Sequence, residues 1–154
     1  MAGRNQKTYR FTLRRGASLY DSVAGAMAAA GVSAAALNIE RAVFSRLRYF
    51  LITTSPDVEQ VAHYTTPLEL EHTAMLVGAG ATVGTTDQGK LAIHCHGLVT
   101  TDSGELIGGH FLTEHCILAK NGVAYLSTLG HMNLVIGIDP EIRTPVFQPS
   151  CREA

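Results

Sequence analysis

The first thirty residues carry two hydrophobic patterns, one after the other. From Thr8 to Leu13, apolar side chains alternate with polar ones, which is the period of a half-buried strand. After a turn at 14–16, apolar residues recur at helical spacing from Leu19 to Ala30. Ser18 is suited to cap the start of this helix, and Gly31 is suited to end it. The pattern therefore predicts a strand, a turn and one amphipathic helix.

The rest of the chain shows short strand-like runs separated by tight turns. β-Branched and aromatic residues mark strands within 36–54, and further runs at 91–101 and 105–118 flank a turn. Asn121-Gly122 is the strongest hairpin signal in the chain. Three glycines predict bends or bulges, namely Gly78, Gly80 and Gly84. This order of elements favours the α+β class, with a mostly antiparallel sheet and one or two helices packed on it.

Length and composition support a single globular domain. The chain has 154 residues, 46% hydrophobic and 16% charged, which excludes intrinsic disorder and leaves room for one core. No apolar run is suited to span a bilayer, and three scattered cysteines form no disulfide framework, so we expect a cytoplasmic protein without a membrane partner. We expect a mobile polar arm over residues 1–7, a single domain over 8–140 and an irregular tail over 141–154.

Charge is spread unevenly along the chain although the net charge is only −1. The first fifty residues contain eight basic and two acidic residues, whereas the remainder contains four basic and eleven acidic ones. Such asymmetry can mark a surface that binds anions or nucleic acid. It can also mean that basic and acidic parts face each other within the fold or across subunits. The near-neutral balance is unlike that of most dedicated DNA-binding domains.

Three histidines on two adjoining strands form the candidate site. His94 and His96 are separated by one residue, so both project from the same face of a strand. If residues 102–104 form a three-residue loop ending on a left-handed glycine, counting back from the loop places His96 opposite His110. Cross-strand neighbours lie about 4.5–5.5 Å apart at Cβ. We therefore expect the three imidazoles to converge on one patch.

Three neutral imidazoles at this spacing suit a divalent cation. Zinc accepts nitrogen ligands at about 2.0–2.1 Å, and three protein ligands leave a fourth position open, as in catalytic sites. Copper, iron and nickel also accept imidazole, so zinc is the leading but not the sole candidate. A water bound to such a metal becomes a nucleophile near neutral pH. The alternative interpretation is that the histidines are polar residues of a solvated sheet face, or contacts to a neighbouring subunit.

Five further residues are candidates for a role beside the histidines. Glu71 precedes the glycine-rich bend and could serve as a general base or orient a metal ligand; otherwise it is an exposed strand carboxylate. Arg46 and Arg48 could contact a ligand or its phosphate. Gly108 and Gly109 would let a ligand approach the backbone closely.

Several of these motifs together resemble the plant-and-prokaryote-conserved (PPC) domain family, of the bacterial stand-alone type. The likeness is strongest in His94–His96, in the acidic-x-Gly turn at 102–104, and in Gly108–His110. Leu13–Gly16, which precedes a helix, is similar to the opening strand and turn of the family. The match runs from Tyr9 to Asp139, which is most of the chain.

The resemblance implies an α+β domain assembled as a homotrimer, with three matching histidines that bind a metal, often zinc. Plant members of the family combine the domain with an AT-hook and act as nuclear DNA-binding proteins. Bacterial members are stand-alone domains that are described as DNA-binding by analogy. This chain contains no Arg-Gly-Arg-Pro core, so it lacks the known reader of the minor groove.

Three hypotheses about function follow. The first is a trimeric PPC-like binding or regulatory protein, DNA-associated by resemblance, with a metal on His94, His96 and His110. The second is a metal-dependent enzyme, a hydrolase or lyase, that acts on a small molecule at the same site. The third is a structural role, in which assembly is the purpose and the histidines are incidental. No motif in the chain names a substrate.

Overall fold

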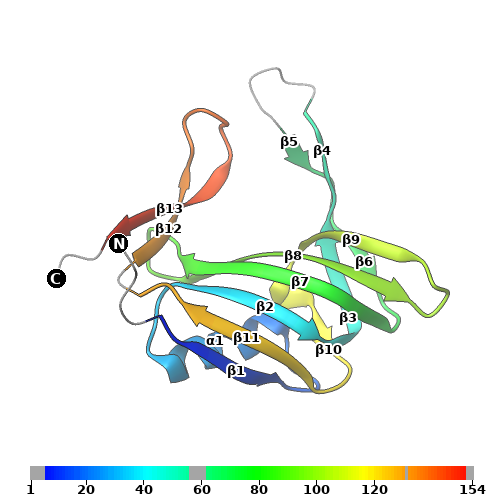
Figure 1. Cartoon of the computed structure of the whole chain (residues 1–154). Helices are drawn as coiled ribbons and strands as arrows, with labels where there is room; N and C mark the ends of the chain where they lie inside the picture. The colour runs from blue at the N-terminus through cyan, green and yellow to red at the C-terminus, as the bar shows by residue number, and fades with distance from the viewer. Residues whose placement is uncertain (1–5, 56–61, 131, 152–154) are drawn as a thin grey trace.

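The computed structural model describes residues 6–55, 62–130 and 132–151 (Figure 1). Most of these residues lie in strands, and one α-helix and one 3-10 helix complete the fold. The elements are β1 (Thr8–Leu13), α1 (Leu19–Ala30), β2 (Ala35–Arg41), β3 (Val43–Phe50), β4 (Ile52–Thr54), β5 (Ala62–Tyr64), β6 (Leu68–Leu70), β7 (Ala74–Thr85), β8 (Leu91–Thr101), β9 (Leu106–Phe111), η1 (Thr113–His115), β10 (Ile117–Leu118), β11 (Gly122–Thr128), β12 (Met132–Ile138) and β13 (Pro145–Cys151).

The opening strand and helix form where the hydrophobic pattern predicts them. The Ser18 hydroxyl accepts a hydrogen bond from the Asp21 backbone N–H at 2.9 Å, which satisfies one of the free donors at the start of α1. Gly31 ends the helix in a left-handed conformation, with φ of 66°, and its N–H bonds to carbonyls of the last turn. Both predicted caps are therefore confirmed.

One large sheet dominates the molecule. Its strands follow the order β1-β11-β2-β7-β8-β9-β3-β10, and the pairs along this path are antiparallel, as predicted for an α+β protein. β3 also pairs with β7, so the sheet bends back on itself. Helix α1 and the sheet enclose the apolar core, to which α1 contributes three buried side chains, Leu19, Val23 and Met27. The fold class inferred from the pattern is confirmed.

Two of the three cysteines belong to this core. Cys95 and Cys116 are fully buried, and burial raises the pKa of each thiol to about 12. Both therefore stay protonated at neutral pH, which agrees with a structural role. Because Cys95 faces the core, its neighbours His94 and His96 face the opposite side of the sheet.

Two hairpins project from the sheet on the same side (Figure 1). One is formed by β4 and β5, and the other by β12 and β13. Part of the tail at 141–154, predicted to be irregular, is regular: Pro145–Cys151 pairs along the whole of β12, and residues 152–154 lie outside the described residues. The three prolines near this tail suggested irregular structure, but an edge strand tolerates proline because one side of it needs no ladder hydrogen bonds.

The Asn121-Gly122 hairpin prediction is wrong. β10 pairs with β3, whereas β11 pairs with β1 and β2, so the chain at this point crosses between separate parts of the sheet. The Asn121 side chain instead accepts a hydrogen bond from the Arg15 N–H at 2.8 Å. The space that a Cβ would need at Gly122 is occupied by the Arg41 carbonyl oxygen, so a close strand approach accounts for the glycine.

The glycine-rich segment from 78 to 84 is also more regular than predicted. It lies within the single strand β7, and the irregularity is one shift of register between Leu76 and Gly78. Of the predicted mobile arm at 1–7, residues 1–5 lie outside the described residues, and Lys7 donates its N–H to Thr128 Oγ1 at 3.0 Å. Among the described residues, no helix has the length and apolar character needed to cross a membrane.

Candidate metal centre

The turn between β8 and β9 sets the register of the candidate site. Gly104 has φ of 83°, and the Thr101 N–H donates to the Glu105 carbonyl at 2.9 Å, so the loop closes as predicted. The ladder that starts at this loop ends with His96 paired to His110. Local turn chemistry thus brings the third histidine to the first two, and the predicted pairing is confirmed.

The three imidazoles lie close enough to share one ion. One ring nitrogen from each of His94, His96 and His110 lies within 4.8 Å of the other two. The shortest separation, His96 Nε2 to His110 Nδ1, is 3.2 Å. Two nitrogens bound tetrahedrally to zinc at about 2.05 Å would be about 3.3 Å apart. The donor set and its spacing therefore fit a divalent metal ion.

Desolvation favours the neutral form of two of these histidines, His94 and His110. The pKa of His110 is lowered to about 4, mainly by burial and to a smaller extent by the neighbouring imidazoles His94 and His96. The pKa of His94 is lowered as well, first by burial and then by His96. A neutral imidazole is the form that binds a metal. At neutral pH, His94 and His110 are therefore in the form that can donate a lone pair to a metal.

Two aromatic side chains that the sequence did not single out enclose His110. The Tyr64 hydroxyl lies 3.4 Å from His110 Nδ1, and the two ring centroids are 5.0 Å apart. Phe50 is paired with His110 across strands β3 and β9, and its ring stacks on Tyr64 at 5.3 Å. Tyr64 comes from the β4–β5 hairpin, and no local pattern around it indicates this long-range contact. The pair shields His110 from water and contributes to its burial.

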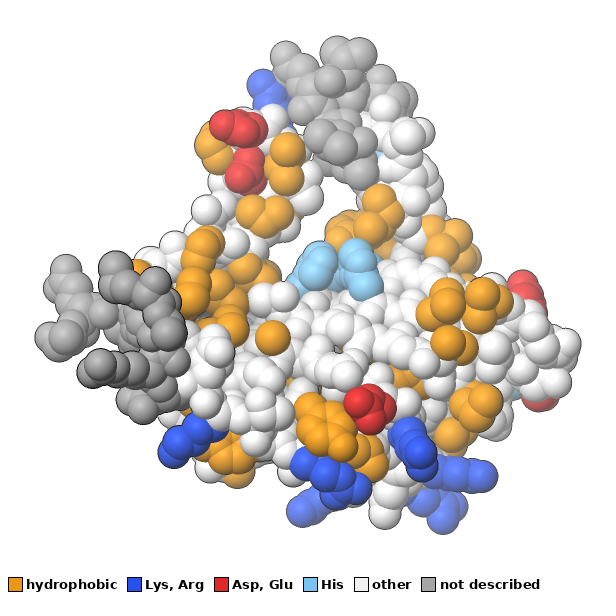
Figure 2. All heavy atoms as spheres, in the orientation of Figure 1, with side chains coloured by type: hydrophobic (Ala, Val, Ile, Leu, Met, Phe, Trp, Pro, Cys, Tyr) orange, Lys and Arg blue, Asp and Glu red, His pale blue; other side chains and the backbone are white. Residues whose placement is uncertain are grey.

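The cluster lies in a recess between the two hairpins. Figure 2 shows histidine side chains at the centre of this face, with the hairpins on either side. His96 lines a hollow of about 480 Å³ together with Gly108 and Gly109, and His94 and His96 line another of about 390 Å³. The site is therefore open to molecules from solution.

The two predicted glycines, Gly108 and Gly109, lie beside His96. Close packing of neighbouring strands is enough to explain why residue 109 is a glycine. A Cβ at Gly109 would collide with the carbonyl oxygen of Phe50, because β3 and β9 approach closely there. A Cβ at Gly108 would meet the Leu98 side chain at 2.7 Å. Gly109 thus allows the strand contact that holds His110 in place.

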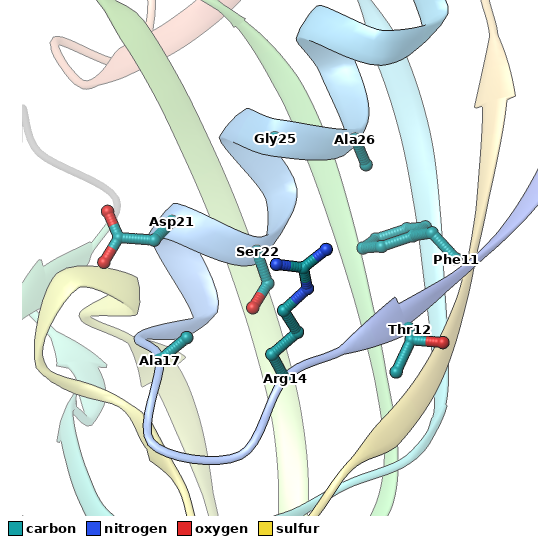
Figure 3. A pocket seen from close by; sticks show the side chains of 8 residues that line it. All are labelled: Phe11, Thr12, Arg14, Ala17, Asp21, Ser22, Gly25 and Ala26. Carbon is teal, nitrogen blue, oxygen red and sulfur yellow. The ribbon is translucent and has the colours of Figure 1, made fainter.

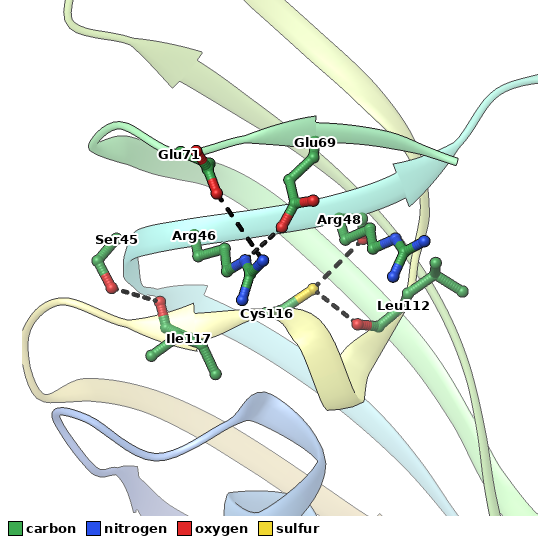
Figure 4. A network of polar contacts seen from close by, with 8 residues as sticks. All are labelled: Ser45, Arg46, Arg48, Glu69, Glu71, Leu112, Cys116 and Ile117. Atoms are coloured by element: carbon green, nitrogen blue, oxygen red, sulfur yellow. Dashed lines mark hydrogen bonds and ion pairs between the residues drawn. The ribbon is translucent and has the colours of Figure 1, made fainter. Parts of the chain in front are cut away.

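Arg46 and Glu71 lie together in a separate cluster (Figure 4). Arg46 Nε pairs with Glu69, and Arg46 Nη2 lies 3.8 Å from Glu71 Oε1. The Glu71 side chain is 78% exposed. In the described part of the chain, the polar contact of Glu71 is with Arg46, so the structure does not bring this carboxylate to a histidine.

Arg48 lies two residues further along β3 and differs from Arg46. It is paired across the strands with Glu69, yet Glu69 binds Arg46. In Figure 4 the Arg48 side chain points away from both glutamates and toward Leu112. Arg48 also lines a cavity of about 470 Å³ that we call the fork pocket, whose lining includes Tyr20, Arg48, Ile93, His110, Leu112 and Ile136. The structure thus brings Arg48, but not Arg46, to a cavity shared with a histidine of the cluster.

A further cavity lies on the other side of the fold. This groove between α1 and β1 has a volume of about 570 Å³; Arg14 and Phe11 point into it, whereas the Asp21 side chain points away from them (Figure 3). None of the three clustered histidines lines it. Basic side chains also gather along the rim near β1 (Figure 2), where the exposed residues are Arg10, Arg14, Arg15 and Arg41. The basic rim is therefore separate from the histidine recess.

Solved structures of other proteins share this fold. A metal-containing protein from Archaeoglobus fulgidus superposes with a TM-score of 0.75 at 17% identity, over 92% of this chain and 93% of that one. A candidate DNA-binding protein from Ralstonia eutropha gives 0.72 at 19% identity, over 91% and 90%. A PPC protein from Pyrococcus horikoshii gives 0.63 at 16% identity, over 90% of each chain.

No protein-family model and no curated protein sequence matches the chain. The backbones of these proteins therefore superpose although their sequences are dissimilar, and this likeness shows the fold. The PPC fold indicated by the histidine and glycine motifs is confirmed.

Proposed function

We propose that this protein binds a divalent metal ion, zinc, on His94, His96 and His110, and uses the ion to hold a ligand from solution. The observation that carries the proposal is the approach of three ring nitrogens to within 4.8 Å in an open recess. Three protein ligands leave one tetrahedral position for a ligand. A protein from Archaeoglobus fulgidus with the same fold is described as metal-containing, which supports the proposal of a metal in this chain.

Metal analysis tests this proposal directly. Protein purified without a histidine tag is expected to contain close to one zinc per chain by plasma mass spectrometry. His94→Ala and His110→Ala should each lose the metal, because two imidazoles hold zinc far more weakly than three. His72→Ala is the matched control, since His72 is exposed and outside the cluster. Protein that takes up no metal even after incubation with zinc would contradict the proposal.

We further propose that the protein assembles as a homotrimer. The support is the family resemblance together with apolar side chains on the face of the sheet that carries the histidines. Met75 and Leu106 are each 58% exposed, and both lie beside Thr100 in the register of β7, β8 and β9. Exposed apolar patches of this kind mark interaction surfaces. Light scattering coupled to gel filtration tests the trimer, and a monomer at micromolar concentration would refute it.

The association with DNA is a second candidate, and the basic rim near β1 is the observation that favours it. Arg10, Arg14 and Arg15 are exposed there, in a protein whose net charge is −1. If these residues contact phosphates, binding to duplex DNA should fall steeply with added salt. Binding that is absent at low salt, or that does not change with salt, would exclude this regulatory role.

Catalysis by the metal centre is the enzymatic alternative. A zinc ion with an open position supplies an activated water for hydrolysis or polarises a bound oxygen for a lyase reaction. The carboxylate predicted to act as a base, Glu71, contacts Arg46, so the geometry favours ligand binding over hydrolysis. Metal-dependent turnover of a small ester or phosphate, lost in His96→Ala, would favour the enzyme instead.

A further inference from the structure

The fork pocket exists because strands β8 and β9 separate beside the metal centre. Their ladder ends at His96 and His110; beyond it β8 continues along β7 toward Leu91, while β9 turns to β3. A cavity of about 470 Å³ opens in this fork. Pockets for small molecules measure about 300–1,000 Å³. The topology therefore places a cavity of suitable size against a histidine of the cluster.

The walls of the fork pocket are part apolar and part polar. Ile93, Leu112 and Ile136 contribute aliphatic surface, and the polar lining residues are Tyr20, Arg48, His110, Thr113, Glu114 and His115. Aliphatic surface of this kind can take the body of an organic molecule. The polar groups then determine which end of the molecule lies where.

Arg48 brings a permanent positive charge to the lining of the fork pocket. Its side chain is half-buried, and across the described residues the structure assigns its guanidinium no hydrogen bond or ion pair. The neighbouring carboxylate of Glu69 is occupied by Arg46. A partly desolvated guanidinium without a partner favours a bidentate anion, above all a carboxylate.

We propose that the fork pocket binds a small organic carboxylate, with the carboxylate on Arg48 and the apolar body along Ile93 and Ile136. If this carboxylate is also the ligand of the metal centre, the inference rests on the proposed function, because His110 belongs to both the fork pocket and the histidine cluster. The Arg48 contact itself does not require the metal.

Glu114 supplies a test of the sign of the charge. This exposed carboxylate also lines the fork pocket, and no ion pair joins it to Arg48 in the described structure. A bound anion is repelled by Glu114, so Glu114→Gln should strengthen binding. If the ligand were a cation, the same substitution would weaken it.

Binding can be measured with a simple probe pair, hexanoate and its neutral analogue hexanamide. Both are titrated into 15N-labelled protein, and the amide signals of Ile93 and Phe111 are followed by NMR. Hexanoate should bind saturably, and hexanamide about tenfold more weakly or not at all. Arg48→Met should weaken hexanoate about tenfold, whereas Arg46→Met, on the same strand, should leave it unchanged.

Several outcomes would overturn the inference. These are equal binding of the two probes, undiminished hexanoate binding in Arg48→Met, tighter binding of hexanoate in Arg48→Met than in Arg46→Met, and no binding of either probe. Dispersed amide spectra and unchanged zinc content in Arg48→Met would show that the variant is folded. Arg48→Lys, which keeps the charge but not the planar fork, should bind hexanoate with intermediate strength.

Zinc content and hexanoate binding are measured separately, so a failure of this inference can be distinguished from a failure of the proposed function. In His94→Ala protein, hexanoate binding that still depends on Arg48 supports the pocket even if no metal is found in the wild type. Stoichiometric zinc without Arg48-dependent binding supports the metal centre and overturns the carboxylate pocket.

Discussion

Strand β3 borders two polar clusters of opposite character. Near its middle, Arg46 is neutralised by Glu69 and Glu71 in an exposed ion-pair network. At its end, Phe50 covers His110, whose neutral ring shares a partly desolvated patch with two further imidazoles. The first cluster pairs its own charges, whereas in the described parts of the chain no ion pair involves the three histidines.

This contrast indicates which kind of polar cluster on the sheet is able to bind a ligand. Exposed ion pairs contribute little to folding and leave no capacity for a ligand. Desolvated groups that lack a partner cost stability in isolation, and an external ion or molecule can supply the partner. The histidine cluster and the free Arg48 both belong to this second kind. Four experiments test whether the two clusters differ in this way.

The largest expected effect is stabilisation by zinc. At a free concentration about a thousandfold above its dissociation constant, a metal that binds only the folded state adds about 4 kcal/mol to the free energy of unfolding. His96→Ala should lose this gain, and Glu71→Gln should keep it because its contact is with Arg46. Thermal unfolding with zinc and with chelator measures the difference. An equal gain in His96→Ala would show that zinc binds elsewhere.

The next effect concerns the close strand approach beneath His110. Gly109→Ala places a methyl group against the Phe50 carbonyl, which we expect to cost about 3 kcal/mol and to reduce zinc uptake. Gly78→Ala is the control, because a Cβ there meets nothing within 4 Å, and it should cost less than about 1 kcal/mol. Urea unfolding compares the two. Equal stability of the two variants would mean that β3 and β9 can separate without loss.

The third effect is a dependence of metal-free stability on pH. The pKa of His110 lies at about 4 in the folded protein and near 6.5 when unfolded, so the unfolded state binds the proton first. Stability should therefore fall as pH decreases from about 6.5 to about 4, and level off below that for this group.

His110→Gln isolates this contribution, because the variant lacks the titrating imidazole. Unfolding midpoints measured across the same pH range should fall less steeply in His110→Gln than in the wild type. Parallel curves would show that His110 titrates normally and that Phe50 and Tyr64 do not desolvate it.

The smallest effect is expected in the ion-pair cluster. Glu69→Gln removes the partner of Arg46, whose side chain is 49% exposed, and should lower the free energy of unfolding by less than about 1 kcal/mol. The loss should shrink further at high salt, because exposed charges are screened. Chemical denaturation at low and high salt checks both. A loss of several kcal/mol would reverse the comparison between the clusters.

The parts of the site that sequence reasoning predicts correctly depend on short stretches of chain. Strand alternation places His94 and His96 on one face, and the left-handed Gly104 sets the register that adds His110. A glycine turn and a period of two are local properties, so they can be read without knowledge of the rest of the fold.

The predictions that fail or fall short involve partners far apart in the chain. Asn121-Gly122 has the composition of a hairpin turn, yet the strands on its two sides pair with different neighbours. Tyr64 reaches His110 only because the β4–β5 hairpin folds over the recess. A turn motif depends only on its own four residues, whereas the pairing of strands depends on how side chains pack throughout the core.

Local periodicity and turn geometry were therefore enough to predict the α+β class, the first helix with its caps, and the convergence of three histidines. The long-range pairing of strands was needed to show that, among the described residues, Arg46 has an ion-pair partner and Arg48 has none, and that β8 and β9 separate at His110 to leave a cavity. The physical reason is that the two arginines have the same chemistry and lie on one strand. What distinguishes them is which carboxylate and which strand end lie beside each, and long-range pairing alone sets that.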